Sequence, residues 1–150
     1  MRKFILLLVI PFVMYACNTT NKTEENQDEP ASMLESSNEE KGVYFVSPSD
    51  GDTVNNPVKV VFGVSGMEIE PAGTVNEGKG HHHIVIDGGY IDKGVVVPAD
   101  SMNIHYGKGQ TETEITLSPG KHTLTMQFAD GFHQSYGKEW SKTIELNVEK

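Results

Sequence analysis

The stretch Thr111–Phe128, T-E-T-E-I-T-L-S-P-G-K-H-T-L-T-M-Q-F, carries the clearest structural pattern in the chain. Apolar and polar side chains alternate on both sides of the central S-P-G, and a period of two residues is typical of a half-buried β-strand. In the second run Leu124, Met126 and Phe128 fall on one face, while the polar residues between them point to the other. Because Pro and Gly between two alternating runs favour a tight turn, the pattern predicts a β-hairpin over Leu117–Leu124.

The same alternation extends outward to four more segments. Strands are expected at residues 43–48, 57–66, 81–87 and 140–148, with Gly, Pro, Asp and Asn between them. No window of a dozen residues shows helical periodicity. The spacing predicts an all-β domain, an immunoglobulin-like antiparallel β-sandwich of about 6–8 short strands, without the Cys–Trp–Cys pattern of antibody domains. A small β-barrel is the competing architecture.

The N-terminus, residues 1–17, has the pattern of a lipoprotein signal peptide. Arg2 and Lys3 precede an apolar run, Phe4–Tyr15, that is too short to span a bilayer. The run ends in a small residue followed by Cys17, the single cysteine of the chain, so no internal disulfide can form. We expect Cys17 to be lipidated and to anchor the protein. A plain cleaved signal that leaves a free thiol is the alternative.

Residues 18–41 are expected to form a disordered acidic tether, because they hold almost no large apolar side chain beyond Met33 and Leu34. A single β-sandwich domain is expected over residues 42–150. Asn18 stands where an aspartate would favour retention at the inner membrane. The expected location is therefore the bacterial cell envelope, with the outer membrane favoured and its periplasmic or outer face left open.

The charge and the motif content exclude several classes of function. The formal net charge is -9 and no basic cluster exists outside Arg2 and Lys3, which argues against nucleic acid as a partner. The glycine-rich stretch Gly107–Glu112 lacks the Lys-Ser/Thr and the helix of a phosphate-binding loop. No serine stands in a G-x-S-x-G elbow, and no carboxylate pair is placed as acid and base. We therefore expect a protein that is not an enzyme.

Several strings together resemble one bacterial family, the domain of unknown function 4399. They include G-H-H-H-I-V-I-D (Gly80–Asp87), I-H-Y-G-K-G-Q-T-E-T-E-I-T-L (Ile104–Leu117) and D-G-F-H-Q-S-Y-G (Asp130–Gly137). The resemblance covers Val43–Val148, essentially the whole expected domain. It implies an exported, compact β domain and brings no established activity, so the function has to be inferred from the residues.

The histidine triplet is divided by strand geometry. Successive side chains point to opposite faces, which places His81 and His83 on one face with Asp87, and His82 on the other with the apolar core. The α-carbons of residues two apart on a strand lie about 6.5–7 Å apart, so two imidazoles at this spacing can converge on one ion. His82 is interpreted as a core residue. His122 is interpreted as a histidine at the core edge that hydrogen-bonds a neighbouring loop.

Further ligands are expected from loops. His105 follows Met102 in one loop, and His133 lies in the loop before the last strand. Imidazoles with a thioether would suit copper, and imidazoles with a carboxylate would suit zinc. The candidate metal or ligand residues are His81, His83, His105 and His133, with Asp87, Met102, Gln110 and Glu112 in support. A polar cluster that only orders the loops is the alternative.

These patterns leave three functions open. The first is a membrane-anchored module that binds a transition metal, copper or zinc. The second is a structural module, or one that binds protein or glycan in the envelope without a metal. The third is a pH sensor, since histidine titrates near neutral pH. The metal hypothesis requires the imidazoles of His81, His83, His105 and His133 to approach a common point within about 4–5 Å, given metal–nitrogen bonds of about 2.0–2.1 Å. The oligomeric state is left open.

Overall fold

The computed structural model describes residues 40–149, which belong to one compact unit. The expected signal peptide, with Cys17, and nearly all of the expected tether lie outside the described residues. Among the described residues no helix is long and apolar enough to cross a membrane. The strands are β1 (Gly42–Ser47), β2 (Thr53–Val54), β3 (Val58–Ser65), β4 (Glu68–Ile69), β5 (Lys79–Ile86), β6 (Asn103–His105), β7 (Glu112–Ile115), β8 (Gly120–Ala129) and β9 (Ser141–Val148), and a 3-10 turn, η1 (Lys138–Trp140), precedes β9.

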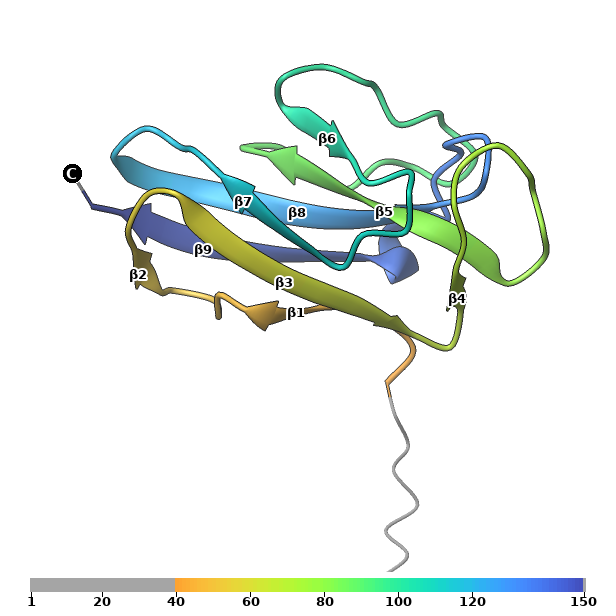
Figure 1. The fold of residues 1–150 in the computed structure, drawn as a ribbon, viewed down its shortest axis with the longest axis horizontal. Helices are drawn as coiled ribbons and strands as arrows, with labels where there is room; N and C mark the ends of the chain where they lie inside the picture. Colours follow the sequence, from red (N-terminus) through yellow and green to blue (C-terminus); the bar gives the residue numbers. More distant parts are fainter. Residues whose placement is uncertain (1–39, 150) are drawn as a thin grey trace, which may run out of the picture. The chain divides into compact units, whose positions relative to one another are not determined.

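The strands form two sheets, with orders β1-β3-β7 and β2-β9-β8-β5-β4, and β6 adds to β5. Figure 1 shows β8 and β9 side by side in blue, with β5 in green next to β8. One apolar core draws side chains from both sheets, including Val60 and Phe62 of the first and Leu124 and Phe128 of the second. The predicted all-β fold is confirmed, and two sheets around one core are consistent with the expected β-sandwich. Two edge pairings, β2 with β9 and β4 with β5, are parallel, so the sheets are not purely antiparallel.

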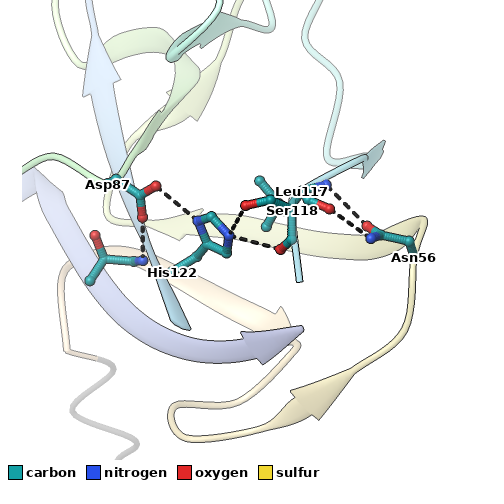
Figure 2. Close-up of polar contacts among 6 residues, drawn as sticks. Asn56, Asp87, Leu117, Ser118 and His122 are labelled. Atoms are coloured by element: carbon teal, nitrogen blue, oxygen red, sulfur yellow. Dashed lines mark hydrogen bonds and ion pairs between the residues drawn. The ribbon is translucent and has the colours of Figure 1, made fainter. Parts of the chain in front are cut away.

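The predicted hairpin is wrong. β7 pairs with β3 in the first sheet, while β8 pairs with β5 and β9 in the second. An alternating strand buries the same face whether its successor lies beside it or across the core, so periodicity cannot separate the two arrangements. The side chain of Asn56 takes both backbone groups of Leu117: its Nδ2 donates to the carbonyl at 2.7 Å, and its Oδ1 accepts from the N–H at 3.0 Å (Figure 2). The chain therefore leaves the first sheet at Leu117 and crosses to the other.

His122 secures the other side of this crossing. Its Nδ1 lies 2.8 Å from Oδ2 of Asp87, and its Nε2 lies 2.9 Å from the carbonyl oxygen and 3.0 Å from the hydroxyl of Ser118 (Figure 2). The ring thereby ties the start of β8 to the residue after β5 and to the crossing segment. As expected from the sequence, His122 hydrogen-bonds a neighbouring loop.

Replacing Asn56 by alanine is expected to lower the free energy of unfolding by about 1–2 kcal/mol, because two backbone hydrogen bonds at Leu117 are lost. Urea unfolding followed by circular dichroism measures the change. The exposed neighbour Asn55 provides the matched control, since its replacement by alanine removes none of these bonds. Equal stability of the two variants would contradict a role for Asn56 in the crossing.

β5 has both faces covered, which explains its unusual histidine content. Seven of its eight residues are buried, and only Lys79 is partly exposed. On the inner face, the ring of His82 packs edge-on against Phe62 and Phe128, with centroids 5.0 and 4.9 Å away. This placement agrees with the interpretation of His82 as a core residue. The other face of β5 carries His81 and His83.

Candidate metal centre

β5 places two histidines side by side. His81 and His83 are 0% and 1% exposed, their ring centroids lie 4.9 Å apart, and their Nε2 atoms lie 3.1 Å apart. The strand is held by β8 on one side, where His81 is opposite Ala129 and His83 is opposite Gln127. This pair has the position that strand alternation predicts.

His105 reaches the same point from β6. It lies directly opposite His83 in the antiparallel pairing of β5 with β6, and the two rings stack with centroids 5.0 Å apart and an interplanar angle of 25°. The ring centroid of His105 is also 4.9 Å from that of His81. The sequence pattern predicted that His105 lies in a loop. It lies instead in a short strand, which sets its distance from β5 through backbone hydrogen bonds.

Gly107 leaves room for the ring of His105. A β-carbon at this position would overlap the Cε1 and Nε2 atoms of His105. The imidazole therefore occupies the space next to the backbone of Gly107. The close approach of the ring is therefore a reason for a glycine at this position.

His133 reaches the cluster from the turn after β8. Its ring centroid lies 5.0 Å from that of His81 and 4.6 Å from that of His105, and its Nε2 lies 3.1 Å from Nε2 of His105. Asp130 builds this turn: its carboxylate accepts the N–H groups of Phe132 and Gln134, and its carbonyl accepts the N–H of His133 at 2.9 Å. His133 has a positive φ of 68°, which is uncommon for a residue other than glycine.

The four imidazoles form one group, the histidine cluster (His81, His83, His105 and His133). All six pairs of ring centroids lie between 4.6 and 5.7 Å apart. Each of His81, His105 and His133 offers a ligand atom within 4.8 Å of the others, so these three could hold a metal ion. Nitrogens at the corners of a tetrahedron with bonds of about 2.0–2.1 Å lie about 3.3–3.4 Å apart, close to the two 3.1 Å separations observed here.

The environment keeps the inner histidines neutral at neutral pH. Burial is the main cause that lowers the pKa of His81 to about 4, and charge on His105 and His133 acts in the same direction. Burial likewise lowers the pKa of His83 to about 3 and lowers the pKa of His105. Since neutral imidazole is the form that binds metals, protons do not compete strongly for His81 and His83 above about pH 5.

Two ring nitrogens of the cluster have no hydrogen-bond partner. They are the Nδ1 atoms of His81 and His83, which are buried and face no donor or acceptor among the described residues. A buried polar atom without a partner costs about 1–3 kcal/mol. Both ring nitrogens of His82, on the core face of β5, are also buried without a partner, so unpaired nitrogens are common to all three histidines of this strand.

Asp87, expected to support the site, is directed elsewhere. β5 ends at Ile86, and Asp87 has a positive φ of 52°, so the alternation that would keep it on the face of His81 stops one residue earlier. Its carboxylate accepts the N–H of Thr123 at 3.0 Å and lies 2.8 Å from the ring of His122. The sequence prediction for Asp87 is wrong, and its role is at the crossing between the sheets.

The other three supporting residues also contact other groups. Gln110 accepts the N–H of Lys108, and Glu112 forms an exposed ion pair with Lys59 at 3.3 Å. Met102 is 42% exposed, and its carbonyl accepts an N–H from the end of β5, away from the cluster end of β6. Turns and edge strands direct these side chains, and neither could be read from residue spacing.

The sequence did not indicate that Gln127 lies beside the site. Gln127 belongs to the polar face of β8, which the alternation predicted to point into solvent. The side chain is nevertheless 0% exposed, because loops cover that face. Its Oε1 accepts the N–H of Ile91, and its Nε2 donates to the carbonyls of Gly137 and Trp140. No sequence pattern distinguishes this glutamine from a solvated one. It fixes the loops beside His83, its partner across the β5–β8 pair.

Comparison with known proteins identifies the domain only by family. The family model described as "Domain of unknown function (DUF4399)" matches residues 60–149. Neither a curated protein nor a solved structure matches the chain. The matched residues include the whole histidine cluster.

Proposed function

The chain belongs to the DUF4399 family, and we propose that its domain binds one transition metal ion, Cu(II) or Zn(II), through the histidine cluster. The observation that carries this proposal is the convergence of His81, His105 and His133, from three separate elements, with ligand atoms within 4.8 Å of one another. His83, whose Nε2 lies 3.1 Å from that of His81, is the fourth ligand.

The donor set favours a divalent ion over Cu(I). Four imidazoles are intermediate in softness and suit copper and zinc, whereas Cu(I) prefers sulfur ligands. The one sulfur expected nearby, that of Met102, belongs to a half-exposed side chain at the far end of β6. For the same nitrogen ligands, affinity rises from Zn(II) to Cu(II), so Cu(II) is expected to bind more tightly.

The proposed setting is the bacterial envelope, with the domain tethered through a lipid on Cys17 and acting as a binding protein with no catalytic step. The N-terminal sequence supports the anchor: a positive start, an apolar run, and the single cysteine after Ala16. Mass spectrometry of the protein from bacterial membranes tests this part. An acylated N-terminal Cys17 is expected, and an intact or plainly cleaved N-terminus would contradict it.

Calorimetric titration of the chain from Asn18 onward with Cu(II) and with Zn(II) tests the metal proposal. One ion per chain is expected, with imidazole nitrogens at about 2.0–2.1 Å by X-ray absorption. If neither ion binds in a fixed ratio, the proposal fails, and the interaction module without a metal becomes the better explanation of the fold.

Replacing Gly107 by alanine is expected to weaken metal binding about 10-fold or more while the domain stays folded. The added methyl group overlaps the ring of His105, which has to move away from the cluster. Gly89 is a matched control, since a β-carbon there meets nothing within 4 Å. Affinity is measured by competition with a chromophoric chelator. Unchanged affinity in the Gly107 variant would show that His105 does not contribute.

A further inference from the structure

The histidine cluster consists of two unequal pairs. The inner pair, His81 and His83, is fully buried on an eight-residue strand with neighbours on both sides. The outer pair, His105 and His133, is exposed and partly exposed. Within each pair the Nε2 atoms are 3.1 Å apart, so each pair alone has the spacing of two ligands bound to one ion.

One element that carries the outer pair, β6, is a short strand at the edge of the sheet. β6 has three residues and pairs only with β5 among the described strands, as its position next to β5 in Figure 1 shows. His105 is the last residue of this edge strand. A short edge strand held by few backbone hydrogen bonds opens at a lower free energy than a central strand does.

The turn that carries His133 is held in an unusual conformation. A residue other than glycine at a positive φ costs about 1–3 kcal/mol and persists only where the surroundings impose it. Here the imposing group is the carboxylate of Asp130, which accepts two N–H groups of the turn. These bonds do not involve the imidazole of His133, so the turn can keep its shape while the ring moves between ligand and free positions.

We propose that His105 and His133 are the exchangeable half of the metal site, and that the ion passes to and from an incoming nitrogen or sulfur ligand on this side. This inference rests on the proposed metal binding. The incoming lone pair forms a bond to the ion as the bond to His133 or His105 breaks, while His81 and His83 stay bound. No electron is transferred, and the released imidazole leaves as a neutral group. The domain is then a carrier that hands over its ion.

Stopped-flow transfer of Zn(II) from the loaded chain to 4-(2-pyridylazo)resorcinol tests the inference. Zinc is used because it undergoes no redox change. In the wild type, the transfer rate is expected to rise in proportion to the chelator concentration, as attack by the incoming ligand requires. The His133→Ala variant is expected to keep one zinc per chain and to transfer it about tenfold faster or more, since changes within one site act mainly on the off-rate.

The His82→Leu variant is the matched control, because His82 lies on the same strand but faces the core. It is expected to transfer zinc at the wild-type rate. A wild-type rate independent of chelator concentration, with one zinc bound, would overturn the exchange inference and leave metal binding intact. A slower transfer from His133→Ala would overturn it too. Failure of the wild type to bind zinc or copper at all would instead overturn the proposed function.

Discussion

Replacing His81 by alanine is expected to lower the affinity for Cu(II) or Zn(II) by at least about 100-fold. Replacing a residue that only positions a metal ligand lowers the affinity by about 10–100-fold, and removing a ligand itself is expected to cost more. His81 occupies the centre of the histidine cluster: its ring centroid lies 4.9, 4.9 and 5.0 Å from those of His83, His105 and His133. His105 is equally near to its three neighbours but is exposed, so His81 is the buried ring that contacts the whole cluster. Removing His81 leaves His83, His105 and His133, which include the most widely separated pair of rings in the cluster.

Affinity in the His81→Ala variant is measured by chelator competition, and circular dichroism checks that the chain is folded. His81→Gln keeps a polar side chain of similar reach and serves where the alanine variant fails to fold. His82→Leu, one residue away and equally buried, is expected to bind as the wild type does. Loss of binding in His82→Leu with retention in both His81 variants would contradict the assignment of the two faces of β5.

The metal-free domain is expected to lose several kcal/mol of stability as the pH falls from about 6.5 towards 4. Burial lowers the pKa of His81 and of His82 to about 4 and that of His83 to about 3. In the unfolded chain these groups titrate near 6.5. Between those values the unfolded state binds more protons, so stability is complete above about pH 6.5 and falls by about 1.4 kcal/mol per pH unit for each histidine.

Urea unfolding at a series of pH values, in the presence of a chelator, measures this loss. Because a whole domain has only about 5–15 kcal/mol of stability, the acid midpoint is expected above the folded pKa values of the buried histidines. The His82→Leu variant removes one of the three titrating groups and leaves the histidine cluster unchanged. The slope of its unfolding free energy against pH is expected to decrease by the equivalent of about one proton. Stability that stays constant down to pH 4 in the wild type would show that these histidines are not buried as the structure has them.

The stability that is lost when carboxylates are protonated is lost in a lower pH range, so it can be separated from the contribution of the histidines. Burial acts to raise the pKa of Asp87, but the N–H of Thr123 and the ring of His122 outweigh it, and the pKa is lowered. Its contribution is present above the ordinary aspartate range and is lost only as the pH falls below it. The decrease above about pH 5 therefore reports on the histidines.

Much of the fold could be predicted from alternation alone. The buried face of β3 carries Val58, Val60 and Phe62, as their spacing predicts. The buried apolar side chains of β8 include Leu124 and Met126 for the same reason. The short strands β2, β4 and β6 could not be predicted, because two or three residues are too few to show a period. Strand pairing could not be predicted either, since the hairpin and the crossing at Leu117 give the same buried face.

The candidate site likewise contains features that the sequence predicted and features that it did not. The facing of His81 and His83, and the opposite facing of His82, follow from strand geometry. The sequence also named His105 and His133, yet the residues that position them, Gly107 and Asp130, carry no pattern of their own. Asp87 was misplaced because the strand ended one residue before the alternation did.

The sequence by itself determined the local periods of the long strands: where these strands lie, which side chains form their apolar faces, and which imidazoles are paired on β5. These depend on backbone geometry over two to eight residues, which neighbouring side chains impose. Only the tertiary structure decided that the Thr111–Phe128 stretch spans two sheets, that β6 brings His105 opposite His83, and that a turn built on Asp130 brings His133 to both. Those contacts depend on the packing of segments far apart in the chain, and packing is set by the whole core and not by any one segment.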